Sequence, residues 1–389
     1  MSEIALLTLA LVITACGQSS VKSNTTTMPL GGAPPGWAGA GSLGPNGGPL
    51  SNNTLPADLV LATGENAPGP VAIDSTYVFW GTSIQDDCCA EVRVVAKAGG
   101  TPTTVFSAPR QLDLPNGVNH QAVVVRLSVD ADWIFADVLE QEVIPTTDGP
   151  DRHSVGSLWR ISRADGTAEA VALPQGYSDV RHAEKSINLL KAPPLDSKSR
   201  ELELAIVSKA TGASTVSTFR PPDPLFGYVD DWIVDSDTLY ISYSNYFGAA
   251  NAHCVARAPV GGGDLEDLWC PDSPARQLAV GADNLFVYSD GSQAGFWMVN
   301  KDTGAARAIA AAAANGAVWA VDEENGMLFG METTLEPMVS ELFQITLATG
   351  ARAKIDLAQG YRHTGMQLDA DRIFFAKGND VFSLGRVTQ

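Results

Sequence analysis

Three of the five histidines end short polar segments that resemble one another, at 114–120, 173–182 and 357–363. In the second and third segments an arginine directly precedes the histidine, and a tyrosine lies a few residues earlier. Imidazole nitrogens bind Zn²⁺, Mn²⁺ or Ni²⁺, and guanidinium groups bind anions through paired hydrogen bonds. The candidate ligand-binding residues are His120, His182, His363, Arg181, Arg362, Tyr177 and Tyr361.

These segments have three interpretations. Their side chains could hydrogen-bond the backbone of neighbouring elements and serve only in packing. They could form a polar pocket in which Arg181 and Arg362 bind an anionic or sugar-like ligand. They could also hold a divalent metal ion through His120, His182 and His363, and no other cofactor is expected. His153 could reach the same face, whereas His253 is predicted to be structural.

The segments recur because the chain from residue 57 onward is built from a repeated unit. In each unit an apolar strand ending in Asp or a similar residue precedes a turn and an aromatic-rich strand, and a glycine turn joins two further strands. Four short strands in about 40–50 residues are typical of a β-propeller blade. Units starting near 71, 124, 186, 231, 277, 317 and 366 predict an all-β, seven-bladed propeller of antiparallel blades.

The last unit ends after three strands, and an isolated strand-like stretch at 58–63 precedes the first unit. We therefore expect the N-terminal strand to complete the last blade, which would remove an open sheet edge. The connections at 82–91, 137–156, 243–253 and 331–340 are long, and they share one end of the ring with the segments that lead into each blade. Insertions gathered at one end predict the binding face.

The start of the chain predicts its location. Residues 4–15 form an apolar run too short to span a bilayer, and the run ends in Ile13-Thr14-Ala15-Cys16. This pattern resembles the lipobox of bacterial lipoproteins, which implies a signal peptide at 1–15 and lipidation of Cys16. Residues 16–56 read as a disordered Gly/Pro/Ser/Asn-rich tether. The expected location is the bacterial outer membrane, with the protein lipid-anchored and facing the periplasm or the surface.

Two cysteines lie symmetrically about the turn at Gly262, eight residues away on each side, at Cys254 and Cys270. In a regular hairpin they would face each other, so we predict a disulfide. Adjacent Cys88 and Cys89 could form a ring with each other, pair between chains or stay free. The acidic turn at 235–237 has too few oxygen ligands for a calcium loop.

Charge limits the classes of partner. Lys and Arg number 25 against 44 Asp and Glu, a net charge of −19, which argues against nucleic acid and against charge-driven binding to anionic lipid. The chain resembles secreted and lipid-anchored bacterial propellers with PQQ-like repeats, on Lys301-Asp302-Thr303-Gly304 and Ala348-Thr349-Gly350. A blade-closing Trp of that family is missing, so no quinone is implied.

The predicted function is a non-enzymatic binding or scaffold module that recognises a cell-envelope protein or glycan through its loop-bearing face. The membrane would be contacted through the lipid anchor only. The alternative is a propeller lyase or hydrolase that acts on a polysaccharide or lactone-like substrate at the channel mouth, with a metal ion as a possible requirement. No nucleophile–base motif is legible in the sequence, which favours the binding module.

Overall fold

The computed structural model describes residues 58–85, 89–110, 119–146, 149–174, 177, 179–193, 201–221, 228–245, 252–291, 294–312, 316–335, 338–359 and 363–385. Every regular element in these ranges is a β-strand. Within them, accordingly, no apolar helix reaches the length needed to cross a bilayer. The predicted signal peptide, Cys16 and the tether lie outside the described residues, as do Tyr361 and Arg362.

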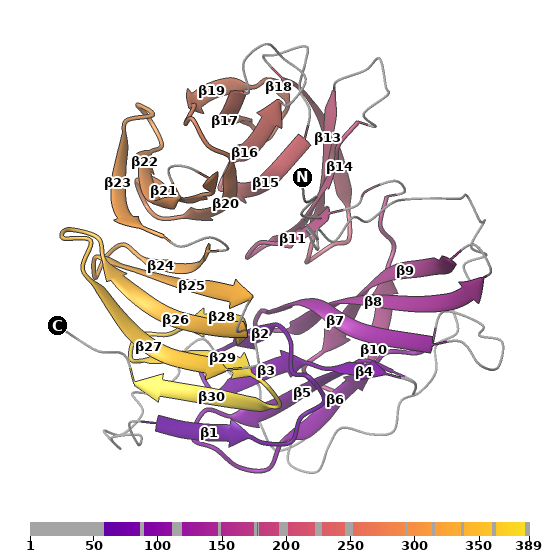
Figure 1. The fold of residues 1–389 in the computed structure, drawn as a ribbon. Coiled ribbons are helices and arrows are strands. Elements are labelled where there is room, and N and C mark those ends of the chain that lie inside the picture. Colours follow the sequence, from indigo (N-terminus) through magenta and orange to yellow (C-terminus); the bar gives the residue numbers. More distant parts are fainter. Residues whose placement is uncertain are drawn as a thin grey trace.

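The strands form seven sheets arranged as the blades of a ring, so the predicted propeller is confirmed (Figure 1). Blade 1 contains β2 (Val71–Ile73), β3 (Tyr77–Gly81), β5 (Glu91–Ala96) and β6 (Thr103–Ser107). Blade 2 contains β7 (Asn119–Val129), β8 (Trp133–Thr146), β9 (Gly149–Ser162) and β10 (Ala168–Val171), with β4 (Ser83–Gln85) beside β7. Blade 3 contains β11 (Asp179–His182), β12 (Ser186–Lys191), β13 (Leu202–Ser208) and β14 (Ser214–Arg220), with β18 (Gly263–Asp264) beside β14.

The remaining blades repeat this order. Blade 4 contains β15 (Tyr228–Asp235), β16 (Thr238–Asn245), β17 (Ala252–Pro259) and β19 (Glu266–Trp269). Blade 5 contains β20 (Ala275–Val280), β21 (Asn284–Ser289), β22 (Gly295–Asn300) and β23 (Ala306–Ala311). Blade 6 contains β24 (Gly316–Asp322), β25 (Met327–Leu335), β26 (Met338–Thr346) and β27 (Arg352–Gln359).

The ring closes through blade 7, which combines the two ends of the described chain. Its strands are β28 (His363–Leu368), β29 (Arg372–Lys377), β30 (Asp380–Gly385) and β1 (Asp58–Ala62). Strand β1 pairs antiparallel with β30, from Asp58 opposite Leu384 to Ala62 opposite Val381. Figure 1 shows the indigo β1 beside the yellow β30. The predicted closure by the N-terminal strand is therefore confirmed.

The hydrophobic core lies between blades, because each sheet buries its faces against its two neighbours. At the first joint Phe79 and Val92 of blade 1 pack in one cluster with Val124 and Ile134 of blade 2, and all four side chains are fully buried. Equivalent clusters fill the other joints, including the closing one, where Trp80 of blade 1 packs with Phe374 of blade 7. Apolar side chains on both faces of the central strands thus hold the ring together.

Three of our boundary predictions were wrong. Most of the segment 331–340, predicted as a loop, belongs to strands β25 and β26, which stay paired up to Leu335 opposite Met338. Blade 3 begins with β11 (Asp179–His182), not near residue 186, and the apolar stretch Ser186–Lys191 is its second strand. The segment 137–156, predicted as a loop, continues the two central strands of blade 2, which stay paired up to Thr146 opposite Gly149. The short strand β4, inside the predicted loop 82–91, pairs with β7 of the next blade.

At three joints the repeated Asp after the first strand of a blade forms an ion pair with the following blade. Asp369 of blade 7 contacts Lys97 of blade 1 at 2.6 Å, Asp74 of blade 1 contacts Arg163 of blade 2, and Asp235 of blade 4 contacts Lys301 of blade 5 at 2.6 Å. Each cation directly follows the third strand of its blade. Its backbone N–H donates a hydrogen bond of 2.8–3.0 Å to a carbonyl oxygen in the turn between the first and second strands of the same blade, which fixes its position. We call this pair the interblade clasp.

Two joints carry apolar or small residues at both clasp positions. At the joint between blades 3 and 4, Ala183 takes the position of the Asp and Val260 takes that of the cation. At the joint between blades 5 and 6, Gly281 and Leu347 take these two positions. Val260 and Leu347 make the same backbone hydrogen bond as the clasp cations, so the positions are equivalent. Acid and cation are thus kept or lost together, as expected if neither charge is tolerated alone in a partly buried joint.

Candidate functional site

The predicted site residues occupy different levels of the ring. His120 is the second residue of β7 and His363 the first of β28, so both lie at the end of their strands that carries the long connections, which we call the loop face. His182 is the last residue of β11, where the turn to β12 begins, and it pairs with Ile187. In blade 7 the position equivalent to His182 is Leu368, the last residue of β28, five residues after His363. At about 3.3 Å per residue, these five residues span roughly 16 Å along the strand. His182 thus lies at the opposite end of its strand from His120 and His363, and a metal site shared by the three histidines stays a prediction.

The imidazole of His182 lies in a dry environment. Both of its ring nitrogens are buried and have no hydrogen-bond partner among the described residues. Burial, together with the nearby charges of Lys209 and Arg126, lowers the pKa of His182 to about 3. The ring is therefore neutral at physiological pH, so it supplies no positive charge for binding an anion.

Arg181 takes part in a chain of charges that crosses the innermost strands of blades 2 to 4. Its guanidinium contacts Asp231 of β15 and lies 3.7 Å from Asp179 of its own strand. Asp179 also accepts a hydrogen bond from Arg126 of β7 at 2.6 Å, and Arg126 lies 3.5 Å from Asp137 of β8. We call these five residues the acid–arginine network.

Blade 4 completes the network. The Trp232 indole donates a hydrogen bond to Asp179, and the Arg181 guanidinium lies 5.5 Å from the centre of the Trp232 ring. The second oxygen of Asp231 accepts the backbone N–H of Leu278 of blade 5 at 2.6 Å. Both arginines of the network are thus already matched to carboxylates.

The electrostatics of the network favour a cationic or hydrogen-bond-donating partner over an anion, because three carboxylates face two guanidinium groups. Burial raises the pKa of Asp137 to about 6, against the opposing effect of Arg126. Burial also raises the pKa of Asp231, which Arg181 opposes. Burial disfavours the ionised form of these carboxylates, and a cation bound nearby would stabilise that ionised form.

Tyr177, another predicted ligand residue, lies near blade 3's own second and third strands. Its hydroxyl is 3.4 Å from Glu203 of β13, which also pairs with Lys191 of β12 at 2.9 Å. Burial raises the pKa of Tyr177, and the Glu203 charge adds to that effect. Tyr177 and Arg181 are therefore both in polar contacts within the ring, and whether they also bind a ligand stays a prediction.

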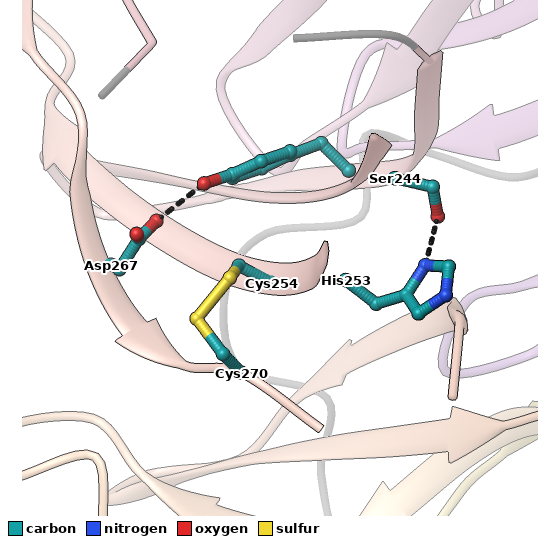
Figure 2. Close-up of a disulfide and its surroundings, with 6 residues drawn as sticks. Ser244, His253, Cys254, Asp267 and Cys270 are labelled. Atoms are coloured by element: carbon teal, nitrogen blue, oxygen red, sulfur yellow. Dashed lines mark hydrogen bonds between the residues drawn. A yellow bond between two sulfur atoms is a disulfide. The ribbon is translucent and has the colours of Figure 1, made fainter. Parts of the chain in front are cut away.

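A second polar cluster lies at the loop face of blade 4, formed by Asp230, Ser244, His253 and Arg276. The Ser244 hydroxyl contacts an oxygen of Asp230 and lies 2.9 Å from Nδ1 of His253 (Figure 2), and Arg276 of blade 5 lies 2.5 Å from Asp230. Burial raises the pKa of Asp230 and lowers that of His253. The serine stands between acid and imidazole, whereas in a Ser-His-Asp triad the imidazole stands in the middle.

The predicted disulfide between Cys254 and Cys270 is confirmed beside this cluster (Figure 2). Their Cα atoms are 4.1 Å apart, and the neighbouring pair Val255–Trp269 keeps the register that the symmetric spacing predicts. Asp267 accepts a hydrogen bond from Tyr243 at 2.7 Å next to the bridge. Asp267 and the two sulfurs form the only His/Cys/Asp/Glu group within the described residues that is close enough to share an ion, but the sulfurs are bonded to each other.

Other sequence signals have structural roles. Asp235, in the acidic turn weighed for calcium, contacts the ammonium of Lys301 in the interblade clasp. Cys89 is disulfide-bonded, and Cys88 lies outside the described residues.

A shallow cleft of about 380 Å³ lies beside the closing strand β1. Glu65, a buried lining residue, accepts hydrogen bonds from Arg93 at 2.9 Å and from Trp80 at 3.1 Å, and Thr101 and Pro102 also line the cleft.

Asp179, Asp231 and Arg126 were missed at the sequence level. Their partners lie about 50 residues away, one blade further along the chain. The available signal was a charged residue four positions before the repeated Asp or its equivalent, Asp130, Ala183 and Asp235; these charged residues are Arg126, Asp179 and Asp231.

The fold is shared with known proteins, but no family is identified: no family model and no curated protein matches the chain. The β-propeller domain of the Trilobed protease from Pyrococcus furiosus superposes with a TM-score of 0.51 at 9% identity, covering 82% of this chain and 94% of that one. Acylaminoacyl peptidase from Pyrococcus horikoshii gives 0.51 at 9%, covering 80% of this chain and 48% of that one. The first of these has an open velcro topology, whereas β1 closes the ring here. At such identity the likeness shows a β-propeller and nothing finer.

Proposed function

We propose that this chain is a lipid-anchored cell-envelope module that binds a protein or glycan partner through its loop face. The observation that supports it is the extension of blade 2. Strand β8 has 14 residues against 9 in β25, the next longest second strand, so the β8–β9 hairpin extends about 16 Å further. Figure 1 shows β8 and β9 as the longest arrows, at the right of the view. A paired extension offers a rigid surface at little cost in ordering on binding.

The charge of the molecule supports a partner that presents cations or hydrogen-bond donors. The net charge is −19, and the acid–arginine network carries more carboxylates than guanidinium groups. Acidic surfaces raise the association rate of basic partners. Anchoring is proposed from the lipobox-like sequence at Cys16, with the tether at 16–56 separating the propeller from the membrane.

A hairpin-shortened variant tests the binding role. Replacing residues 141–154 by Asn-Gly would join Glu140 to Val155, which are directly opposite in the present register, through a two-residue turn. We expect cross-linking in intact cells to recover an envelope partner with the native chain and to lose it with this variant. The matched control is Val216→Ser on the outer strand β14, where the side chain is 55% exposed. Equal recovery by the native and shortened chains would refute the proposal.

The anchor has its own test. The Cys16→Ser variant should lose incorporation of a labelled fatty acid and move from the membrane fraction to the soluble fraction. A chain that keeps its label after this substitution would contradict lipidation at Cys16.

The second candidate function is a lyase or hydrolase, favoured by the Asp230 and His253 pair. Burial raises the pKa of Asp230, and a carboxyl group with a raised pKa is a candidate general acid or base. Ser244 between them is fully buried, which is why binding ranks first. Turnover of a polysaccharide or lactone panel that disappears in Asp230→Asn would reverse this ranking.

A further inference from the structure

The outer half of blade 4 brings an acidic side chain beside the disulfide. Tyr243 of β16 is directly opposite Cys254 of β17, and Cys254 is bonded to Cys270, which directly follows β19. The two sulfur atoms and a carboxylate oxygen of Asp267 all lie within 4.8 Å of one another (Figure 2). Two sulfurs and one oxygen are thus gathered at one point on the sheet.

A β-bulge in β19 places Asp267 there. Asp267 and Cys270 are three residues apart, and an odd separation puts side chains on opposite faces of a regular strand. Here the register shifts by one residue, because Val255 of β17 is opposite Trp269 whereas Ala256 is opposite Asp267. The extra residue in β19 returns the Asp267 side chain to the face that carries the bridge. Bulges re-aim side chains in this way next to functional sites.

We propose that Cys254, Cys270 and Asp267 bind one divalent transition-metal ion once the disulfide is reduced, and Zn²⁺ is the probe. Thiolate sulfur and carboxylate oxygen are both zinc ligands, and three protein ligands leave a fourth position open for water or a ligand group. With Zn–S bonds of about 2.3 Å, two sulfurs in a tetrahedral site are about 3.8 Å apart. The three ligand atoms already lie within 4.8 Å of one another, so side-chain rotation is enough to form the site.

The disulfide and the metal ion exclude each other. A dithiol reductant passes two electrons and two protons to the Cys254–Cys270 bond, which breaks into two thiols while the dithiol becomes a disulfide. The metal ion then replaces the two thiol protons, which pass to solvent. Cys270 and Asp267 are exposed, so a reductant and an ion can reach the site, whereas Cys254 is buried. The redox state of the bridge therefore controls whether the ion binds.

Tyr243 orients the carboxylate of this site. Its hydroxyl donates a hydrogen bond of 2.7 Å to one oxygen of Asp267, and its side chain is buried in the joint between blades 3 and 4. The hydrogen bond leaves the second carboxylate oxygen to face the metal ion. Hydrogen bonds from neighbouring groups commonly hold metal ligands in position. The inference does not rest on the proposed binding function, since zinc binding and partner recovery are measured separately.

Calorimetric titration of the full chain with zinc chloride tests the site. The chain is titrated in its oxidised form and again after treatment with dithiothreitol, which is removed in the absence of oxygen. We expect reduction to add one bound Zn²⁺ per chain, and this ion should be missing in reduced Cys270→Ser. The same comparison accounts for the thiol of Cys89, which reduction also releases.

Two carboxylate variants separate a three-ligand site from a pair of thiols. Asp267→Asn should weaken zinc binding at least about tenfold, because even the loss of a group that only supports a ligand costs that much. Glu266→Gln is the matched control: its residue is adjacent to Asp267, lies on the opposite face of the sheet and is 72% exposed. The control should bind zinc as the native chain does.

Two further readouts keep the proposal falsifiable. Cobalt bound to the reduced native chain should show sulfur-to-metal charge-transfer absorption that is stronger than in reduced Cys270→Ser. Added zinc should raise the melting temperature of the reduced chain more than that of the oxidised chain. If reduction unfolds the chain, zinc should restore a cooperative melting transition, because its binding then drives folding. The same zinc stoichiometry before and after reduction, or native affinity in Asp267→Asn, would overturn the site.

Discussion

Neutralising Asp74 should open the clasp between blades 1 and 2 without disturbing the turn that Asp74 organises. One of its oxygens accepts the backbone N–H groups of Thr76 and Tyr77, both at 2.6 Å, and the other contacts Arg163. Asn keeps an oxygen for the two backbone groups but removes the charge that faces Arg163. The Asp74→Asn variant therefore isolates the ion pair.

The expected cost follows from burial. The side chains of Arg163 and Asp74 are only 10% and 13% exposed, so solvent screens the pair weakly. Leaving one partner of a buried ion pair unmatched costs about 3–5 kcal/mol. Arg163 keeps a hydrogen bond to the Asp130 carbonyl oxygen at 2.6 Å and its position 5.7 Å from the centre of the Phe79 ring. These remaining contacts favour the lower end, about 3 kcal/mol.

Guanidinium chloride unfolding measures this loss, with Lys191→Gln as the control. Lys191 and Glu203 form an ion pair whose side chains are both 38% exposed, so breaking it should cost less than about 1 kcal/mol. A double-mutant cycle with Arg163→Met should show coupling between Asp74 and Arg163. If Asp74→Asn costs no more than Lys191→Gln, burial of the clasp does not control its strength, and the explanation of the repeated Asp is wrong.

Three further outcomes are expected. The double variant Cys254→Ser/Cys270→Ser should lose about 3 kcal/mol, because the bridge closes a loop with a sequence separation of 16; equal unfolding midpoints for the native chain with and without reductant would contradict this. Asp137 has a folded pKa of about 6 against 3.8 unfolded, so its ionisation destabilises the fold as pH rises through this window. The stability of Asp137→Asn relative to the native chain should therefore increase between pH 4 and 7 by up to about 3 kcal/mol, and a constant difference across a urea-unfolding pH series would refute it. On the closing strand, Leu61→Ala should cost about 2–4 kcal/mol in thermal unfolding because Leu61 is 3% exposed, whereas Val60→Ala, at 49% exposed, should cost below about 0.5 kcal/mol.

The propeller was predictable because every blade repeats one strand pattern, and the misplaced start of blade 3 shows the limit of that pattern. Ala183 stands where most blades carry the clasp Asp, so the strongly apolar Ser186–Lys191 stretch resembled a first strand. The blade 2 hairpin was missed because Glu140 and Glu142 are buried acids in positions where a strand pattern is expected to be apolar. Alternation in sequence assumes that buried positions are apolar, and these two residues break that assumption.

The candidate site was less predictable than the fold for a physical reason. Spacing in the sequence correctly paired Cys254 with Cys270, because both lie on paired strands of one blade, although the register shifts by one residue between Val255 and Ala256 on the way from the turn. The partners of Arg181 lie partly on the neighbouring blade, and Arg126 of blade 2 likewise pairs with Asp179 of blade 3. A single sequence carries no signal for pairing across a joint, so these groupings required coordinates.

The closure of blade 7 by β1 has a consequence for the order in which the chain folds. Pairs within blades 1 to 6 join residues that are near in sequence, so each of these sheets can form as soon as its own strands are available. Residue 58 finds its partner only at residue 384, at the opposite end of the described chain. In a chain delivered from its N-terminus, β1 must therefore wait with an unpaired edge until β30 arrives, and the last step of folding is a loop closure over nearly the whole propeller. A chain cut short before β30 would keep that edge open.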